Sequence, residues 1–195
     1  MKPPFKIILA SASQRREKLL REAGLTFEVS PSRVQERHLL TSTRPALVKY
    51  NALLKANDVA SRLKEGVVIA ADTIVFDGDK NVVGKPRHVQ EAAEVLLRLC
   101  RLPHWVYTGV AVVDVAKGRR IVDYEKTKVF MQPLSPEEIS RYHRKISPLD
   151  KAGGYNIEGV GGLFIGRIEG CYTNVIGLPM AKLRRMLQQC GVSLL

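Results

Sequence analysis

Residues 8–16 read Ile-Leu-Ala-Ser-Ala-Ser-Gln-Arg-Arg, a short apolar run followed by two serines and a pair of arginines. The apolar residues 7–10 predict a buried strand, and residues 15–20 begin an amphipathic helix with a leucine face. Basic residues are unusual in a first helical turn, because unpaired N–H groups make that end positive. Ser11 and Ser13 are small enough to let an anion approach, so the stretch predicts a strand–turn–helix unit that binds phosphate.

The composition of the chain is that of an ordinary globular protein. It has 195 residues, of which 45% are hydrophobic and 26% charged, enough for one domain with a sizeable core. No apolar run approaches the ~18 residues that span a bilayer, and the run near the N-terminus is too short for a signal peptide. The three cysteines are widely spaced and match no metal-ligand pattern, which favours reduced thiols in a cytoplasmic protein.

The net charge is +12, which indicates an anionic substrate or partner. The basic residues are dispersed, however, and aromatic residues make up only 6% of the chain. A basic stripe with interleaved aromatic residues is the usual mark of nucleic-acid binding. We therefore expect no specific nucleic acid and no membrane among the partners.

Strand-like and helix-like segments follow one another without a linker, a repeat or strict alternation. This mixture predicts an α/β protein with a mixed, twisted sheet flanked by helices. Three predicted helices cover 43–63, 89–101 and 179–189, and two more begin at Arg15 and at the capping box of Ser135. The predicted strands cover 7–10, 26–30, 67–76, 104–115 and 121–132, and turns are predicted at 77–79 and 117–118.

Asp72 directly follows the apolar run 67–71 of a predicted strand, and Lys85 follows a predicted hairpin strand. Asp72 follows a continuous apolar run, where a carboxylate must be paired or bound to a metal to offset its desolvation. A cap or a structural ion pair is the alternative. Lys85 lies between Gly84 and Pro86 in a turn that gives it a definite direction, although an exposed turn lysine fits equally well.

Three further features are ambiguous taken singly. Lys55 interrupts a helix whose other residues look core-facing, where a lysine usually extends toward solvent. Glu36 has no local signal, and residues 150–159 form a charged, glycine-rich loop that could wrap a ligand or be a surface turn. Together, the candidates supply the charges needed for a nucleoside triphosphate with Mg²⁺ or Mn²⁺: the cations Arg15, Arg16, Lys55 and Lys85, and the carboxylates Glu36 and Asp72.

These motifs resemble the Maf family, nucleotide pyrophosphatases related in fold to inosine triphosphate pyrophosphatase. The matching stretches are 11–16, 71–73, 84–87, 150–159 and 174–179, which follow the same order and span nearly all of the chain. The resemblance implies a single Maf-like domain over 1–195, with two lobes around a central cleft (the Maf/Ham1 fold). The absence of a P-loop pattern suits this assignment.

The resemblance also implies an activity and a set of roles. A nucleotide diphosphatase of this kind cleaves a nucleoside triphosphate between the α and β phosphates, a reaction that can remove non-standard nucleotides. Asp72 matches the catalytic base or the carboxylate that orients water and metal, and Glu36 matches a second metal ligand. Arg15 or Arg16, Lys55 and Lys85 match the phosphate clamp, and the family suggests a homodimer.

Substrate choice depends on three positions. Arg15 and Thr73 resemble the branch that prefers dTTP, UTP and modified pyrimidine analogues. The third position in that branch is usually glutamine, whereas this chain has Glu158, which resembles the branch that acts on 7-methyl-GTP. An ionised carboxylate only accepts hydrogen bonds, whereas an amide also donates. Two positions of three favour pyrimidines.

Two other function classes stay open on the sequence alone. A non-catalytic protein could bind nucleotides or nucleic acid and regulate cell division, and a nucleotidyltransferase could pass the nucleotide to an acceptor. Release of pyrophosphate without an acceptor distinguishes the hydrolase from both.

Overall fold

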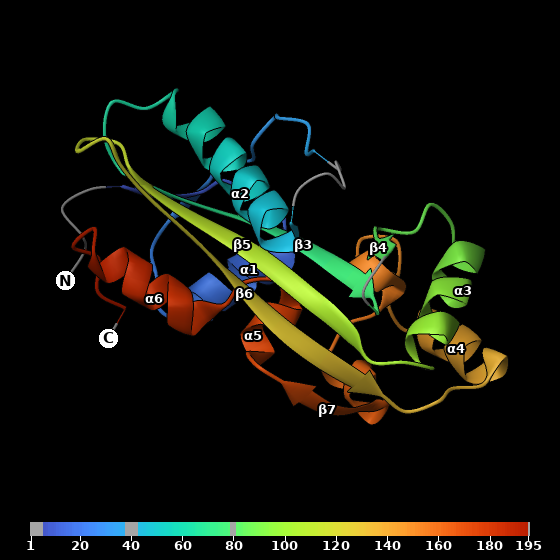
Figure 1. The fold of residues 1–195 in the computed structure, drawn as a ribbon. Helices are drawn as coiled ribbons and strands as arrows, with labels where there is room; N and C mark the ends of the chain where they lie inside the picture. The colour runs from blue at the N-terminus through green and yellow to red at the C-terminus, as the bar shows by residue number, and fades with distance from the viewer. Residues whose placement is uncertain (1–5, 38–42, 79–80, 195) are drawn as a thin grey trace. The chain divides into compact units, whose positions relative to one another are not determined.

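A computed structural model describes residues 6–37, 43–78 and 81–194, and its secondary structure is α/β (Figure 1). The helices are α1 (Gln14–Glu22), α2 (Arg44–Ala60), α3 (Val89–Leu99), α4 (Pro136–His143), α5 (Tyr172–Ile176) and α6 (Met180–Gln188), with the 3-10 helices η1 (Ala152–Gly154) and η2 (Gly159–Leu163). The strands are β1 (Ile7–Leu9), β2 (Glu28–Val29), β3 (Val67–Asp77), β4 (Asn81–Val83), β5 (His104–Asp114), β6 (Arg119–Met131) and β7 (Ile165–Glu169).

The strands pair in the order β2-β1-β3-β5-β6-β7, and β4 pairs with β3. β1 is parallel to β2 and β3, whereas β4 is antiparallel to β3 and β7 is antiparallel to β6. This confirms the mixed sheet that the sequence predicts. The chain divides into two compact units: unit 1 is Met1–Asp72, Thr108–Glu125 and Gly177–Leu195, and unit 2 is Thr73–Tyr107 and Lys126–Ile176.

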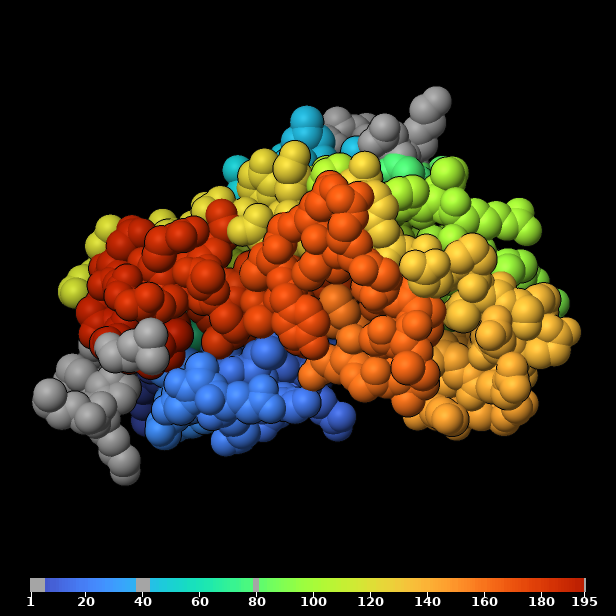
Figure 2. Space-filling model, turned by 90° about the horizontal axis from the view of Figure 1, so that it is seen from below, coloured from blue at the N-terminus to red at the C-terminus, as the bar shows by residue number. Residues whose placement is uncertain are grey.

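Unit 1 is a three-layer arrangement. Alternate strand residues such as Leu9 and Ile69 face α1 and α6, and their neighbours Ile8 and Ala70 face α2. The two helical layers lie on opposite sides of the strands in Figure 1, and Figure 2 shows the side covered by α1 and α6. On the other side the contact is very close, since a Cβ added to Gly109 of β5 would lie 2.1 Å from the Val48 carbonyl oxygen of α2.

Unit 2 has its core on one side of its strands. Val75 of β3, Val106 of β5 and Val129 of β6 pack with buried residues of α3 and α4, including Leu96 and Ile139. Among the described residues, no helix is both long enough and apolar enough to cross a lipid bilayer.

Most predicted elements are confirmed, including the capping box in which the Ser135 and Glu138 side chains each accept from the other's backbone N–H. The predicted strand over 26–30 is only two residues long, and α2 ends at Ala60. The turn that the sequence predicts over 77–79 includes Asp79, which lies outside the described residues. β7 and α5 are additional elements within the glycine-rich C-terminal third, where the apolar pattern predicted neither.

Candidate functional site

Asp72 is a buried carboxylate in the interior of β3, with 2% of its surface exposed. The strand predicted over 67–76 is confirmed, because β3 continues to Asp77, and Asp72 therefore lies inside this strand rather than directly after it. Its Oδ1 accepts from Lys55 Nζ at 2.7 Å, and its Oδ2 accepts from Asn51 Nδ2 at 3.0 Å. Both carboxylate oxygens therefore have a hydrogen-bond donor, which offsets the cost of burying the charge in the middle of a strand.

Lys55 connects the two predicted carboxylates. Its Nζ lies 2.7 Å from Asp72 Oδ1 and 2.6 Å from Glu36 Oε1, and its side chain is only 12% exposed. The snorkelling alternative for this lysine is therefore wrong. Since the Glu36 side chain is 43% exposed, the cluster extends from a buried carboxylate to one that meets solvent.

Asn51 is a site residue that the sequence interpretation missed. It precedes Lys55 by four positions, so both side chains lie on the same face of α2. Besides donating to Asp72, Asn51 donates from Nδ2 to the Arg37 carbonyl at 3.0 Å and accepts from the Arg37 N–H at 3.0 Å. Asn51 thus fixes the segment that carries Glu36 against the helix that carries Lys55.

Replacing Asn51 by alanine is expected to lower kcat of the expected nucleotide hydrolysis about tenfold, because the Asp72 carboxylate loses one of its two described partners. The corresponding rise in the activation free energy is about 1.5 kcal/mol. The free energy of unfolding should fall by about 1–3 kcal/mol, since buried groups lose their partners. Steady-state kinetics and thermal unfolding measure the two effects. Asn57→Ala on the same helix, whose Oδ1 accepts from Arg120 Nε at 3.1 Å, is the matched control; equal losses in both variants would contradict the positioning role.

Arg16 is buried rather than extended toward a ligand. Its Nη1 donates to Ser11 Oγ at 3.0 Å and to the Ala71 carbonyl at 2.9 Å, and its Nε donates to the Gly177 carbonyl at 2.9 Å. Burial lowers the pKa of Arg16, while the negative charges of Asp72 and Glu36 act in the opposite direction. These contacts give Arg16 a structural part within the site and leave Arg15 as the better candidate for phosphate.

The N-terminal end of α1 lies in the same cluster. Arg15 is half-buried and its positive charge acts on Arg16 together with Asp72 and Glu36. Ser13 is the N-cap residue but makes no side-chain capping hydrogen bond, and its N–H donates to Ser11 Oγ at 3.3 Å. The Ser13 hydroxyl therefore does not cap the amides of the first turn.

Unit 2 carries the other three predicted site residues. Thr73 follows Asp72 directly on β3 and is half-buried, Lys85 is exposed in the turn after β4, and Glu158 is the half-buried N-cap residue of η2. The Gly153 N–H donates to the Gly84 carbonyl at 3.2 Å, so the turn of Lys85 lies beside the loop over 150–159.

The same loop is fixed from within unit 2. His104 is fully buried, and its Nε2 lies 2.7 Å from the Tyr155 hydroxyl. Burial lowers the pKa of His104 to about 4, so the ring is neutral near pH 7 and the contact is a hydrogen bond between neutral groups. Glu158 thus belongs to a loop with a buried anchor.

Unit 1 therefore brings together one set of predicted residues: Ser11, Ser13, Arg15, Arg16, Glu36, Lys55 and Asp72. Their convergence with Lys85 and Glu158 stays a prediction. The chemistry of the set suits a hard divalent cation, because Mg²⁺ takes oxygen from one or two carboxylates and completes its shell with substrate phosphates and water. Within the described ranges, no group of three or more His, Cys, Asp or Glu could hold a metal ion by itself.

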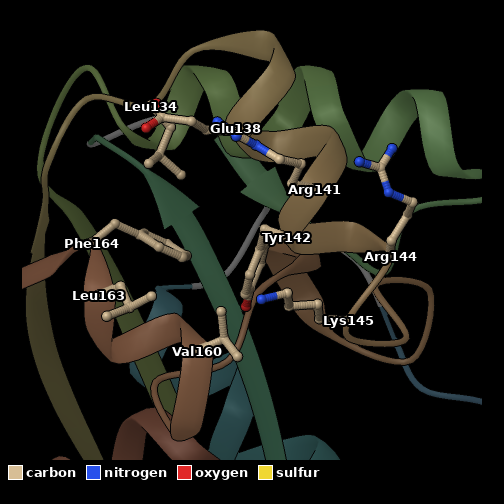
Figure 3. A pocket seen from close by; sticks show the side chains of 9 residues that line it. All are labelled: Leu134, Glu138, Arg141, Tyr142, Arg144, Lys145, Val160, Leu163 and Phe164. Atoms are coloured by element: carbon tan, nitrogen blue, oxygen red, sulfur yellow. The ribbon is translucent and has the colours of Figure 1, made fainter.

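A separate pocket of about 610 Å³ lies in unit 2 (Figure 3). None of the predicted site residues is among those that line it. Its lining residues are Leu134, Glu138, Arg141, Tyr142, Arg144, Lys145, Val160, Leu163 and Phe164. The Tyr142 hydroxyl donates to Asn156 Oδ1 at 2.7 Å, which further anchors the loop that carries Glu158.

The sequence of this chain matches one protein family over most of its length. The family model described as Maf-like protein matches residues 6–190. The chain belongs to the Maf family. The matched range includes every residue of the candidate site described above.

Curated relatives of this Maf protein match over nearly their whole length. It is 46% identical to a dTTP/UTP pyrophosphatase of Carboxydothermus hydrogenoformans, over 96% of this chain and 100% of the relative. It is 44% identical to a dTTP/UTP pyrophosphatase of Desulforamulus reducens, over 96% and 98% of the two chains. The Ham1 protein of Staphylococcus aureus has a similar fold, with a TM-score of 0.53 at 14% identity over 94% and 98% of the chains.

Proposed function

We propose that this Maf protein hydrolyses dTTP and UTP to the nucleoside monophosphate and pyrophosphate. The observation that carries the proposal is the buried Asp72 carboxylate, held by Lys55 and Asn51 beside Arg16 and Glu36. This is an arrangement for orienting water next to a polyphosphate. The names and identities of the curated relatives support the pyrimidine substrates.

The chain's own residues supply orientation and charge. In the proposed reaction a water oxygen adds to the α-phosphorus, the bond from that phosphorus to the bridging oxygen breaks, and pyrophosphate leaves. Asp72 orients the water and accepts its proton on a carboxylate oxygen. Lys55, and Arg15 at the positive end of α1, stabilise the charge that develops on the phosphate oxygens.

We also infer a divalent cation, Mg²⁺ or Mn²⁺, as the cofactor. Asp72 and Glu36 are the residues that would hold it, and their contacts with the Lys55 ammonium support a position that favours positive charge. When bound, such an ion neutralises phosphate charge and polarises the substrate. Pyrophosphate release that persists after chelation with EDTA would contradict this part of the proposal.

A panel of five nucleotides tests the substrate class: dTTP, UTP, 5-methyl-UTP, CTP and 7-methyl-GTP. We expect kcat/KM to be highest for dTTP, UTP and the methylated uridine nucleotide. A preference for 7-methyl-GTP would instead assign this chain to the guanine branch and make Glu158 the reason. Absence of pyrophosphate release from every nucleotide, with salt-sensitive DNA binding, would favour the non-catalytic regulator. Labelled nucleotide retained on a second substrate would indicate a nucleotidyltransferase.

Replacing Glu158 by glutamine is expected to raise the ratio of kcat/KM for dTTP over 7-methyl-GTP by about tenfold, the effect of one hydrogen bond to the base. The reason is that an amide both donates and accepts at a pyrimidine edge. Glu94→Gln, an exposed glutamate of α3, is the control and should leave the ratio unchanged. An unchanged ratio in Glu158→Gln would remove this residue from base selection.

We further propose a homodimer, which the resemblance to the Maf family implies, and a cytoplasmic location, which the three free thiols favour. Analytical ultracentrifugation at micromolar concentration tests the oligomeric state, and a monomer at all concentrations would contradict it.

A further inference from the structure

One side of the unit 2 strands gathers basic and aromatic side chains. We call it the aromatic-basic face, and it consists of Trp105 of β5, Lys126, Lys128 and Phe130 of β6, and Arg167 of β7. Residues 126, 128 and 130 alternate along β6 and so point to one side. Phe130 pairs with Arg167 across the antiparallel ladder, which places Arg167 on that side too. Figure 1 shows β7 beside β6 in this region.

The cations of this face lie over its rings. Lys126 Nζ and Lys128 Nζ are 5.3 Å and 5.5 Å from the centre of the Trp105 ring. Lys128 Nζ is also 5.2 Å from the Phe130 ring, and Arg167 Cζ is 4.1 Å from it. Two aromatic platforms therefore share three positive charges within a continuous patch.

The opposite side of the same strands explains why these groups meet solvent. The intervening residues Val106 and Val129 pack into the core with α3 and α4, and Thr127 is fully buried. The rings of Trp105 and Phe130 are half-buried, and Lys126 and Arg167 are exposed. The folded structure thus concentrates on one surface the aromatic and basic residues that are dispersed along the sequence.

We propose that the aromatic-basic face binds single-stranded nucleic acid without sequence preference, in addition to the proposed hydrolysis of nucleotides. Exposed bases would stack on Trp105 and Phe130, and the lysines and Arg167 would contact the phosphates. Base–aromatic stacking is stronger than an exposed cation–π contact, so a base can displace a lysine from a ring and leave its charge for the backbone.

The charges of the face favour a polyanion over a second copy of the chain. Glu169 pairs with Lys128 across the ladder and bonds to Arg167 Nη1 at 3.0 Å, so the face carries three positive charges and one negative. A two-fold interface would place these like charges opposite one another. The overall charge of +12 adds attraction for a polyanion.

Trp105 makes the test direct, because it is the single tryptophan of the chain. We expect titration with a 15-nucleotide oligo-dT to quench its fluorescence, whereas a double-stranded 15-mer should not. Contacts from Lys126, Lys128 and Arg167 should give a slope of about −2 for log K against log salt concentration, at about 0.7 per phosphate contact. Unchanged tryptophan emission on binding would overturn the proposal.

Variants locate the surface. Lys126→Gln with Lys128→Gln should reduce the slope to about −0.7, the value for one remaining phosphate contact, and weaken binding at least about tenfold, measured by anisotropy of a labelled oligonucleotide. Arg141→Gln with Arg144→Gln is the matched control, because Arg141 of α4 and the C-cap residue Arg144 are exposed cations of the same unit. Equal weakening in both double variants would assign the binding to net charge alone.

Turnover separates this proposal from the proposed function. Pyrophosphate release should be unchanged in the lysine double variant, whose residues have no part in the candidate site. Displacement of the oligonucleotide by a saturating non-hydrolysable dTTP analogue would show that it occupies the triphosphate site, and would overturn a separate face. Binding in a protein that releases no pyrophosphate would contradict the proposed function alone.

Discussion

Asp72→Asn is expected to lower kcat for dTTP at least ~100-fold, the usual effect of removing a positioned general base. An amide cannot accept a proton from water as a carboxylate does. The substitution also places an NH₂ group against Asn51 Nδ2 or Lys55 Nζ, both of which donate to Asp72. Stopped-flow or coupled detection of pyrophosphate gives the rate.

Stability is the necessary control for this variant. Placing one donor against another in a buried site costs about 1–3 kcal/mol of unfolding free energy, which thermal unfolding can quantify. Asp114→Asn is the matched comparison, because Asp114 is also buried at 6% exposure and accepts from the Lys117 N–H at 3.2 Å. A kcat for Asp72→Asn within threefold of the Asp114→Asn value would reject Asp72 as the base.

Lys55→Met is expected to be nearly as damaging to activity and more damaging to the fold. Methionine keeps the length of the side chain but leaves Asp72 and Glu36 without the ammonium that lies between them. Removing one partner of a buried ion pair costs about 3–5 kcal/mol, and the partial exposure of Glu36 places the expected loss near the lower end. We expect kcat/KM to fall at least ~100-fold, since charge stabilisation of the phosphates is also lost.

Lys182 provides a close control for Lys55. It is a half-buried lysine of α6 that also lies between two carboxylates, with Nζ 2.6 Å from Asp123 and 4.0 Å from Glu125. Lys182→Met should reduce stability while kcat/KM stays within about threefold of the wild-type value. If the two variants lose activity in proportion to their loss of stability, Lys55 has only a structural role.

The parts of the site that were predictable are those with an unusual residue in a regular pattern. A carboxylate within the apolar run of β3 and a lysine within the apolar face of α2 are both costly to bury alone. In the structure the two charges pair with each other, which explains why both are buried. Asn51 gave no such signal, because an asparagine in a helix is ordinary in sequence. Its part depends on a contact with Arg37, which the helical pattern does not contain.

The role of Arg16 also depends on contacts that the sequence pattern does not contain. The sequence identified two adjacent arginines but could not distinguish them, since both stand in the first turn of α1. The difference arises from the carbonyls of Ala71 and Gly177, which meet the Arg16 guanidinium only in the folded chain. Likewise β7 was not predicted, because its five residues pair with β6 through a ladder between distant segments.

The bonds of Arg16 also bear on the order in which the protein can be completed during synthesis. Its guanidinium donates to Ser11 and to two carbonyls that lie 55 and 161 residues after Arg16 in the chain. A nascent chain that has not yet emerged from the ribosome as far as Gly177 lacks one of these acceptors. Unit 1 therefore reaches its final state only after translation has passed through all of unit 2 and has reached the last segment of unit 1, which begins at Gly177.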